Sequence, residues 1–208
     1  MKFVTIADTH GLHQQLTLPQ GDVLIHAGDV SKMGKLHEIV AFLDWFSSLD
    51  FEHKIFIAGN HDFYFEDATA QQLQAILPAN VHYLCNSSVV INGVTIWGSP
   101  ISPFFFNWAF NVQRGEAIAK YWNTIPTNVD VVVTHGPVLG YLDKTTTGLN
   151  VGCADLLTTL NSLQPKYHIC GHIHEGYGQT HNTYCTFINA SVVNVRYQVC
   201  NAPITFEL

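Results

Sequence analysis

Five short segments of this chain combine carboxylate, imidazole and amide side chains with glycine. They read Asp8-Thr9-His10-Gly11, Gly28-Asp29, Gly59-Asn60-His61-Asp62, Thr134-His135-Gly136 and Gly171-His172-Ile173-His174. Oxygen and imidazole nitrogen donors in this mixture suit cations such as Mn, Fe or Zn. A glycine beside a ligand lets the backbone turn sharply enough to aim the neighbouring side chain. We therefore interpret these segments as the parts of a metal site.

The number of donors indicates how many cations such a site holds. Seven are too many for one cation and suit two cations that share a bridging carboxylate, and the candidate ligands are Asp8, His10, Asp29, Asn60, His135, His172 and His174. Two divalent cations roughly 3.5–4 Å apart can clamp a phosphate between them. The sequence therefore predicts a site for two divalent metal ions that acts on phosphate esters.

Each segment follows a short apolar run, as the loop after a buried strand would. The runs are Phe3–Ala7, Val23–Ala27, Ile55–Ala58, Val129–Val133 and Tyr167–Cys170. Several are rich in Val and Ile, which is typical of strands buried on both faces. Parallel strands present their carboxyl ends at one edge of a sheet, so we expect the loops to converge. In extended chain, the i, i+2 spacing of Asp8/His10 and of His172/His174 would place both members of each pair on one side.

The stretches between these runs predict helices and hairpins. Helical spacing of apolar residues, or a similar composition, occurs in Leu36–Phe46, Leu73–Leu77, Gln113–Trp122 and Asp155–Leu163. Asn92-Gly93 separates two β-prone runs within Val89–Gly98, which is a strong hairpin signal. We expect a second hairpin in Tyr184–Leu208, around Asn201-Ala202-Pro203. The expected fold class is α/β, with two mixed β-sheets packed as a sandwich flanked by helices.

Composition limits the possible partners and location. A length of 208 residues suits one domain over residues 1–208. The formal charge is −7, with 9 Lys+Arg against 16 Asp+Glu and no basic cluster, which argues against a nucleic-acid partner. No apolar run approaches the roughly 20 residues that span a bilayer, and the first residues lack a signal-peptide pattern. Five scattered cysteines suit a reducing compartment, so we expect a cytoplasmic protein without a membrane partner.

The five segments, in this order, resemble the motif set of the calcineurin-like metallophosphoesterases. Four further stretches resemble the metallophosphoesterase-domain-containing branch, which is similar to cyclic-nucleotide phosphodiesterases: Thr95–Pro100, Trp108–Asn111, Val151–Cys153 and His174–Gly178. The resemblance implies a double β-sandwich flanked by helices. It also implies that one metal is held by Asp8, His10, Asp29 and His174, and the other by Asp29, Asn60, His135 and His172. His61 would face the phosphate and assist the leaving group, with Asp62 as its hydrogen-bond partner.

The resemblance also narrows the reaction. Protein phosphatases of this superfamily follow Gly-Asp with an Arg that grips phosphate, whereas this chain continues Val30-Ser31-Lys32. We therefore expect a hydrolase of the phosphodiesterase type, in which a metal-bridging hydroxide attacks a small phosphoester, with nucleotides among the candidates and manganese among the metals. A phosphomonoesterase and a catalytically weak protein that keeps only the fold stay open as alternatives.

Two features could contribute to substrate binding beside Asn60 and His61. Arg114 is the only Arg in the first 195 residues, and a substrate contact and a helix-surface position are equally compatible with its surroundings. An aromatic-rich stretch contains Trp97, Phe104–Phe106, Trp108 and Phe110. It could form a wall for stacking a nucleobase, but packing into the core is the favoured interpretation.

Overall fold

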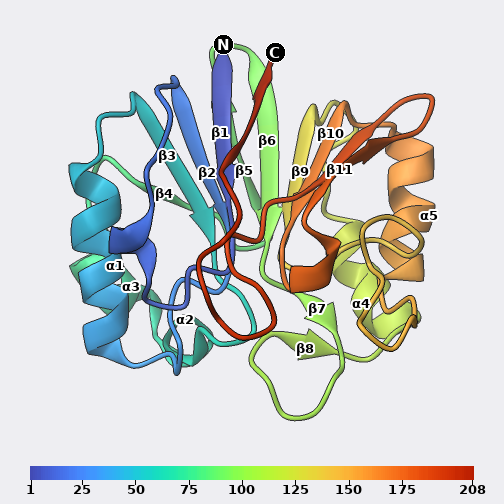
Figure 1. Cartoon of the computed structure of the whole chain (residues 1–208). Helices are drawn as coiled ribbons and strands as arrows, with labels where there is room; N and C mark the ends of the chain where they lie inside the picture. Colours follow the sequence, from blue (N-terminus) through green and yellow to red (C-terminus); the bar gives the residue numbers. More distant parts are fainter.

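The computed structural model describes all residues 1–208, and its first sheet carries the N-terminal strands. Its strand order is β13-β1-β2-β3-β4 (Figure 1). Four strands run parallel: β1 (Lys2–Ile6), β2 (Val23–Ala27), β3 (His53–Ile57) and β4 (His82–Tyr83). The last strand, β13 (Ile204–Glu207), pairs antiparallel with β1 and brings the two chain ends together.

The second sheet is built from the rest of the chain, in the order β11-β12-β10-β9-β6-β5. Its parallel centre comprises β6 (Val94–Ser99), β9 (Val131–Thr134), β10 (Tyr167–Cys170) and β12 (Thr186–Asn189). The edges β5 (Ser87–Ile91) and β11 (Gly178–His181) are antiparallel. A separate pair, β7 (Ser102–Pro103) and β8 (Asn111–Val112), lies below this sheet in Figure 1.

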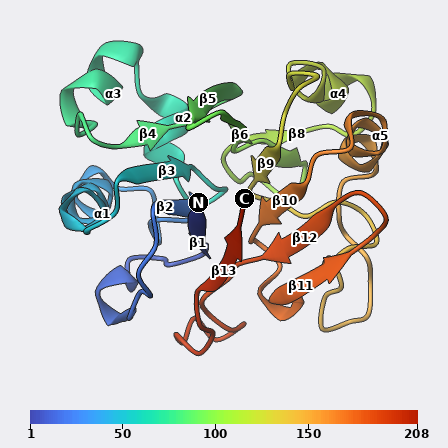
Figure 2. The same cartoon turned by 90° about the horizontal axis from the view of Figure 1, so that it is seen from above.

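The two sheets pack face to face, and alternate residues of each strand divide between the two cores. Ile25, Ile55 and Val131 belong to the cluster between the sheets, whereas their neighbours Leu24 and Phe56 belong to the larger cluster under the helices. Both faces of the central strands are therefore buried, which explains why these runs are apolar throughout. Figure 2 shows the two sheets as adjacent layers with both termini between them.

Helices cover the outer face of each sheet. On the first sheet lie α1 (Leu36–Ser48), α2 (Phe63–Asp67) and α3 (Ala70–Ile76), and on the second α4 (Glu116–Trp122) and α5 (Ala154–Leu163) (Figures 1 and 2). Short 3₁₀ turns occur at His13–Gln15 and His174–Gly176. The predicted α/β sandwich is confirmed. None of the helices combines the length and the apolar character needed to cross a membrane.

Of the two predicted hairpins, one is present and one is wrong. Asn92 and Gly93 both have left-handed φ angles, 49° and 85°, and connect antiparallel β5 and β6. The C-terminal segment forms no strand pair around Asn201-Ala202-Pro203, and folds back only in a local turn closed by an antiparallel bridge between Val193 and Val199. Instead, β12 pairs with β10 and β11 in the second sheet, while β13 crosses to the first sheet. Local alternation of β-prone residues identified the strands, but their partners are set by distant chain segments.

Candidate metal centre

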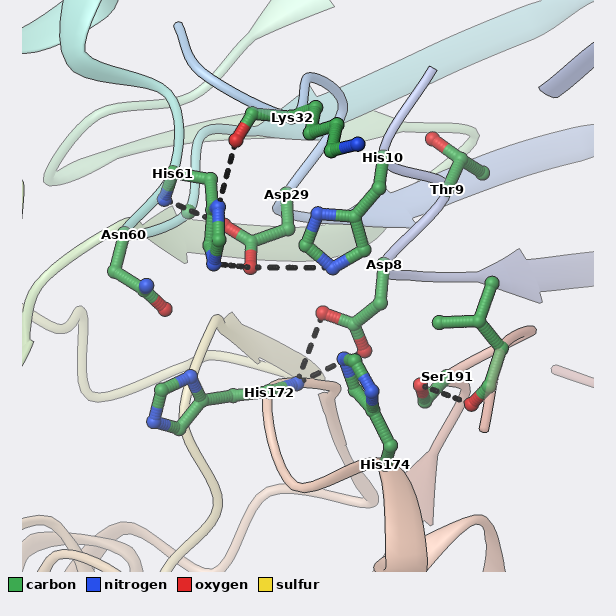
Figure 3. A network of polar contacts seen from close by, with 12 residues as sticks. Asp8, Thr9, His10, Asp29, Lys32, Asn60, His61, His172, His174 and Ser191 are labelled. Atoms are coloured by element: carbon green, nitrogen blue, oxygen red, sulfur yellow. Dashed lines mark hydrogen bonds and ion pairs between the residues drawn. The ribbon is translucent and has the colours of Figure 1, made fainter. Parts of the chain in front are cut away.

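The loops that follow β1, β2, β3, β9 and β10 meet at one end of the sandwich, opposite the chain termini (Figure 1). Figure 3 shows Asp8, His10, Asp29, His61 and His174 directed toward a common space. Asp8 and Asp29 are almost completely buried, with exposed fractions of 0% and 2%. Neither carboxylate has a Lys or Arg partner, so the surrounding imidazoles or a bound cation must supply the positive charge that a buried carboxylate needs.

Asp29 occupies the middle of this cluster. Its Oδ2 atom lies 3.3 Å from His135 Nε2 and 3.7 Å from His10 Nε2. Its Oδ1 atom accepts a 2.9 Å hydrogen bond from the backbone N–H of His61. Possible ligand atoms form three overlapping groups, with all atoms of a group within 4.8 Å of one another. Asp29 belongs to two of them, Asp8/Asp29/His135 and His10/Asp29/His61, and the third is Asp8/His10/His174. This carboxylate therefore lies where one side chain could contact two cations.

Three of the imidazoles are oriented as metal ligands are. The Nδ1 atoms of His10, His135 and His174 lie 3.2, 3.0 and 3.2 Å from the backbone carbonyl oxygens of Ser31, Ala27 and Asn194. A carbonyl oxygen can only accept, so Nδ1 carries the proton and Nε2 is free for a metal. His10 Nε2 is buried and has no hydrogen-bond partner. The donor set therefore fits the divalent cations that the sequence predicts.

The charges at the centre support this interpretation. Burial alone would raise the pKa of Asp29, but the nearby His135, followed by His10 and His61, holds it well below its ordinary value. Burial would lower the pKa of His135, yet Asp29 outweighs that effect and raises it to about 9. His135 Nε2 also lies 2.9 Å from Asn60 Oδ1. Without metal, a proton on His135 thus supplies the positive charge that Asp29 attracts.

The backbone at the centre departs from the extended conformation that the i, i+2 spacing assumed. Asp8, His10, Asp29 and His172 have left-handed φ angles of 57°, 43°, 57° and 67°. Such conformations cost of order 1–3 kcal/mol each and concentrate at functional sites. The chain turns sharply as soon as each strand ends, so this turn and not strand alternation aims the side chains. The extended-chain premise was wrong, although the residues do meet.

Glycine is required at two positions because backbone and carboxylate approach closely. A Cβ atom on Gly171 would lie 2.5 Å from Asp8 Oδ2, and one on Gly59 would overlap the Asp29 carboxylate. Real Cβ atoms do not approach neighbours so closely. These two glycines therefore let the loops after β10 and β3 pack directly against the two central carboxylates.

His172 contributes its backbone to the centre. Its N–H lies 2.9 and 3.1 Å from the two carboxylate oxygens of Asp8, which joins the loops after β1 and β10. Its ring points away from Asp8 in Figure 3 and lies against the ring of His135, with centroids 4.9 Å apart. The ring of His172 is thus less closely associated with the other predicted ligands than those ligands are with one another.

His61 and Asp62 follow each other in sequence but have different surroundings. His61 Nδ1 lies 2.8 Å from the Lys32 carbonyl oxygen, and its ring packs on Trp108 with centroids 4.3 Å apart. The Asp62 carboxylate accepts hydrogen bonds from Val30 N, Ser31 N, Ser31 Oγ and Gly59 N. Burial, with the charge of Asp29 adding to it, raises the pKa of Asp62 to about 6. Asp62 thus joins the loops after β2 and β3, and the expected hydrogen bond to His61 is not present.

Tyr197 is a residue of the site that the sequence did not reveal. It has a left-handed φ of 57°, and its ring lies 4.8 Å from that of His10 and 5.4 Å from that of His174. The Asn194 side chain accepts hydrogen bonds from the N–H groups of Arg196 and Gln198 and so shapes the turn that carries Tyr197. An Asn-centred turn is recognisable in sequence, but its place beside the site depends on the course of the chain between β12 and β13.

Arg114 and the aromatic stretch lie beside the centre in different ways. Trp97 and Phe110 are buried, as the core interpretation expects. Phe104, Phe105 and Phe106 are 49%, 57% and 69% exposed, so core packing is wrong for them. Arg114 lines a neighbouring cavity with His172 and does not line the space over Asp29.

Comparisons with known proteins agree with this geometry. The family model for calcineurin-like phosphoesterases matches residues 1–176. The whole chain aligns with 71% of the length of human metallophosphoesterase domain-containing protein 1, at 41% sequence identity. It aligns with 81% of the length of a Caenorhabditis elegans UPF0046 protein, at 39% identity. Among solved structures, the phosphopantetheinyl hydrolase of Mycobacterium tuberculosis superposes with a TM-score of 0.64 over 94% of this chain and 90% of that protein. At 16% identity, that likeness shows the fold alone.

Proposed function

The chain belongs to the calcineurin-like phosphoesterase family, and from this membership we propose that it is a phosphodiesterase that uses two divalent metal ions to hydrolyse a small nucleotide-like diester. The observation that carries the proposal is the position of Asp29 between His10 and His135. Both imidazoles bind a backbone carbonyl through Nδ1 and direct Nε2 toward the Asp29 carboxylate.

The proposed metal ligands form two sets that share Asp29. One set is Asp8, His10, Asp29 and His174, and the other is Asp29, Asn60, His135 and His172. When bound, the cations would supply positive charge that acidifies a water molecule and offsets the negative charge of the phosphoryl oxygens. Manganese is the first metal to test, because this oxygen and imidazole donor set suits it.

His61 is the proposed general acid. Its Nδ1 donates to the Lys32 carbonyl, so Nε2 is the nitrogen that faces the cavity and Asp29 Oδ2, at 4.0 Å. An imidazolium at this position can give its Nε2 proton to the departing oxygen near neutral pH. The alkoxide leaving group of a diester needs such a proton. Asn60, on the same loop, is the proposed second contact to the phosphate.

The lining of the cavity over the centre favours a diester over a monoester. This cavity has a volume of about 250 Å³, and its walls include Asn60, His61, Trp108, Glu175 and Tyr197. No Lys or Arg lines it. A phosphate monoester carries about two negative charges at neutral pH and gains most from a cationic clamp. A diester has one charge and a second organic group, for which the aromatic side chains provide contact area.

The test compares two model esters. Metal-stripped protein would be reloaded with Mn²⁺ and assayed with bis-(p-nitrophenyl) phosphate and p-nitrophenyl phosphate, with Asp29→Asn as control. Metal-dependent turnover that favours the diester and disappears in the variant supports the proposal. Preference for the monoester would support the phosphomonoesterase alternative. Absence of turnover despite bound metal would support a protein that keeps the fold without efficient catalysis.

The proposal includes a small phosphoester as the partner, one domain over residues 1–208 and a cytoplasmic location. The net charge of −7 is unfavourable for a nucleic-acid polymer. The five cysteines are all free thiols, and Cys153, Cys170 and Cys185 are buried. Free thiols persist in a reducing compartment, which supports the cytoplasmic part of the proposal.

A further inference from the structure

A second cavity lies beside the metal centre. Its volume of about 270 Å³ is close to the lower end of the range for small-molecule pockets. His172 and Phe105 line both this cavity and the one over Asp29. A molecule with its phosphate at the metal centre could therefore extend past these two side chains into the second cavity.

The walls of this side cavity are largely apolar, and two of them are aromatic side chains that the core does not use. Phe104 and Phe105 line it although each is about half exposed. Their backbone is fixed, because Phe104 N–H donates to the Val112 carbonyl and Phe105 N–H donates to Asn111 Oδ1. Pro137 and Ile173 line it as well. Flat apolar walls of this kind favour a planar ring, which gains both burial and stacking.

Arg114 provides the only permanent positive charge in the walls of this side cavity. Its two terminal nitrogens donate to the carbonyl oxygens of Gly152 and Val151, at 2.8 and 2.7 Å. No carboxylate pairs with the guanidinium, whose charge is therefore uncompensated. A guanidinium has five N–H groups, so donors remain for a ligand. Acceptor atoms on a ring would satisfy these donors.

We infer that this cavity binds the organic group of the diester that is not the leaving group, as a flat heteroaromatic ring whose carbonyl oxygens accept hydrogen bonds from Arg114. This inference rests on the proposed function, since it takes the phosphate to lie at the metal centre. The apolar walls select the ring, and Arg114 selects its acceptor atoms. Arg114 is thus a specificity residue.

The experiment compares two esters with the same leaving group. Thymidine 5′-(p-nitrophenyl phosphate) carries a ring with two carbonyl oxygens, and methyl p-nitrophenyl phosphate carries no ring. The quantity measured is the ratio of their kcat/KM values with Mn²⁺-loaded protein. Arg114→Met removes the donors, and Val151→Phe fills the cavity from its wall. Lys120→Met, on the exposed surface of α4, is the matched loss of a cation.

We expect wild-type protein to prefer the thymidine ester, and each cavity variant to lower the ratio about tenfold, the effect of one charge-assisted hydrogen bond or a lost ring contact. Lys120→Met should leave the ratio unchanged. If the cavity variants leave this ratio unchanged, the inference is overturned. The same holds if they lower kcat/KM equally for both esters, since the ratio then stays the same. If neither ester is hydrolysed, the proposed function fails. Ligand-observed NMR then tests, independently of activity, whether thymidine binds to the side cavity. Binding that Arg114→Met abolishes would support the site, and absence of binding would overturn it.

Discussion

His61 Nδ1 lies 2.8 Å from the carbonyl oxygen of Lys32, so the loop after β2 fixes the orientation of the His61 imidazole (Figure 3). Trp108 packs against the ring with centroids 4.3 Å apart. These contacts leave Nε2 toward the cavity with no protein hydrogen-bond partner that would compete for its proton. The His61 ring is thus oriented by the Lys32 carbonyl and by the ring of Trp108, while the neighbouring Asp62 carboxylate joins the loops after β2 and β3.

His61→Ala should lower kcat by roughly 10²–10⁴-fold with a diester whose leaving group is an alkoxide, the usual contribution of a general acid, and much less with a p-nitrophenyl ester, whose leaving group departs without a proton. The metal content should stay unchanged, because the Nδ1 atoms and the carbonyls that orient His10, His135 and His174 do not involve His61. Steady-state kinetics and metal analysis of the same sample provide the measurement. Loss of metal from the variant would contradict the role proposed for His61.

Asp62→Asn should destabilise the protein, because the carboxylate accepts four hydrogen bonds from the loops after β2 and β3. An amide nitrogen would face N–H groups that it cannot satisfy, at a cost of about 3 kcal/mol. Urea unfolding of metal-stripped wild type and variant gives the difference in the free energy of unfolding. Asp155→Asn is the control, because the Asp155 carboxylate accepts one bond, from Gly115 N–H. Equal effects of the two substitutions would show that Asp62 has no special structural role.

Gly59→Ala should abolish metal binding, because its new Cβ would overlap the Asp29 carboxylate. Gly136→Ala is the matched control next to the predicted ligand His135. A Cβ there would meet only Ser102 Cβ, at the ordinary distance of 3.8 Å. Metal content after reloading with Mn²⁺ distinguishes the two variants. Retention of metal by Gly59→Ala would mean that the Asp29 loop can shift without loss of the site.

His168 should make the protein less stable in acid. It is fully buried, and burial lowers its pKa to about 3 from the ordinary 6.5. Between these values the unfolded chain binds a proton that the folded protein does not, so the free energy of unfolding falls as pH falls below about 6.5. From pH 7.5 to 5.5 the loss from this group is about 1.4 kcal/mol.

The corresponding measurement is denaturant unfolding of metal-stripped protein at both pH values, for wild type and His168→Gln. The His168 Nε2 atom lies 2.8 Å from Thr134 Oγ1, which itself donates to the Gly136 carbonyl. A glutamine amide can replace the imidazole as donor without titrating. The variant should therefore show a smaller loss of stability in acid. Identical pH dependence in both proteins would exclude His168 as the source.

Sequence patterns predicted the elements better than the contacts between them. The strands before Asp8, Asp29, Asn60, His135 and His172 were recognisable, because strands buried on both faces must be continuously apolar. Their parallel arrangement then predicted that these loops meet. The Asn92-Gly93 hairpin was predictable because its geometry is local.

Features that depend on distant segments were not predictable. β13 pairs with β1 across nearly the whole chain, and no local pattern specifies that partner. The three exposed phenylalanines Phe104–Phe106 have the composition of a core segment, and only the fold shows that they remain outside. Tyr197 reaches the centre for the same reason, through the path of the chain between the two sheets.

The central claim is that Asp29 joins two metal ions in one catalytic centre. Its most direct test is to titrate metal-stripped protein with Mn²⁺ and to follow bound metal and hydrolysis of bis-(p-nitrophenyl) phosphate together, in wild type and Asp29→Asn. We predict two ions per wild-type chain, with turnover that rises as the pair fills, and loss of both properties in the variant. Turnover without added metal, or full metal binding and activity in Asp29→Asn, would contradict the account.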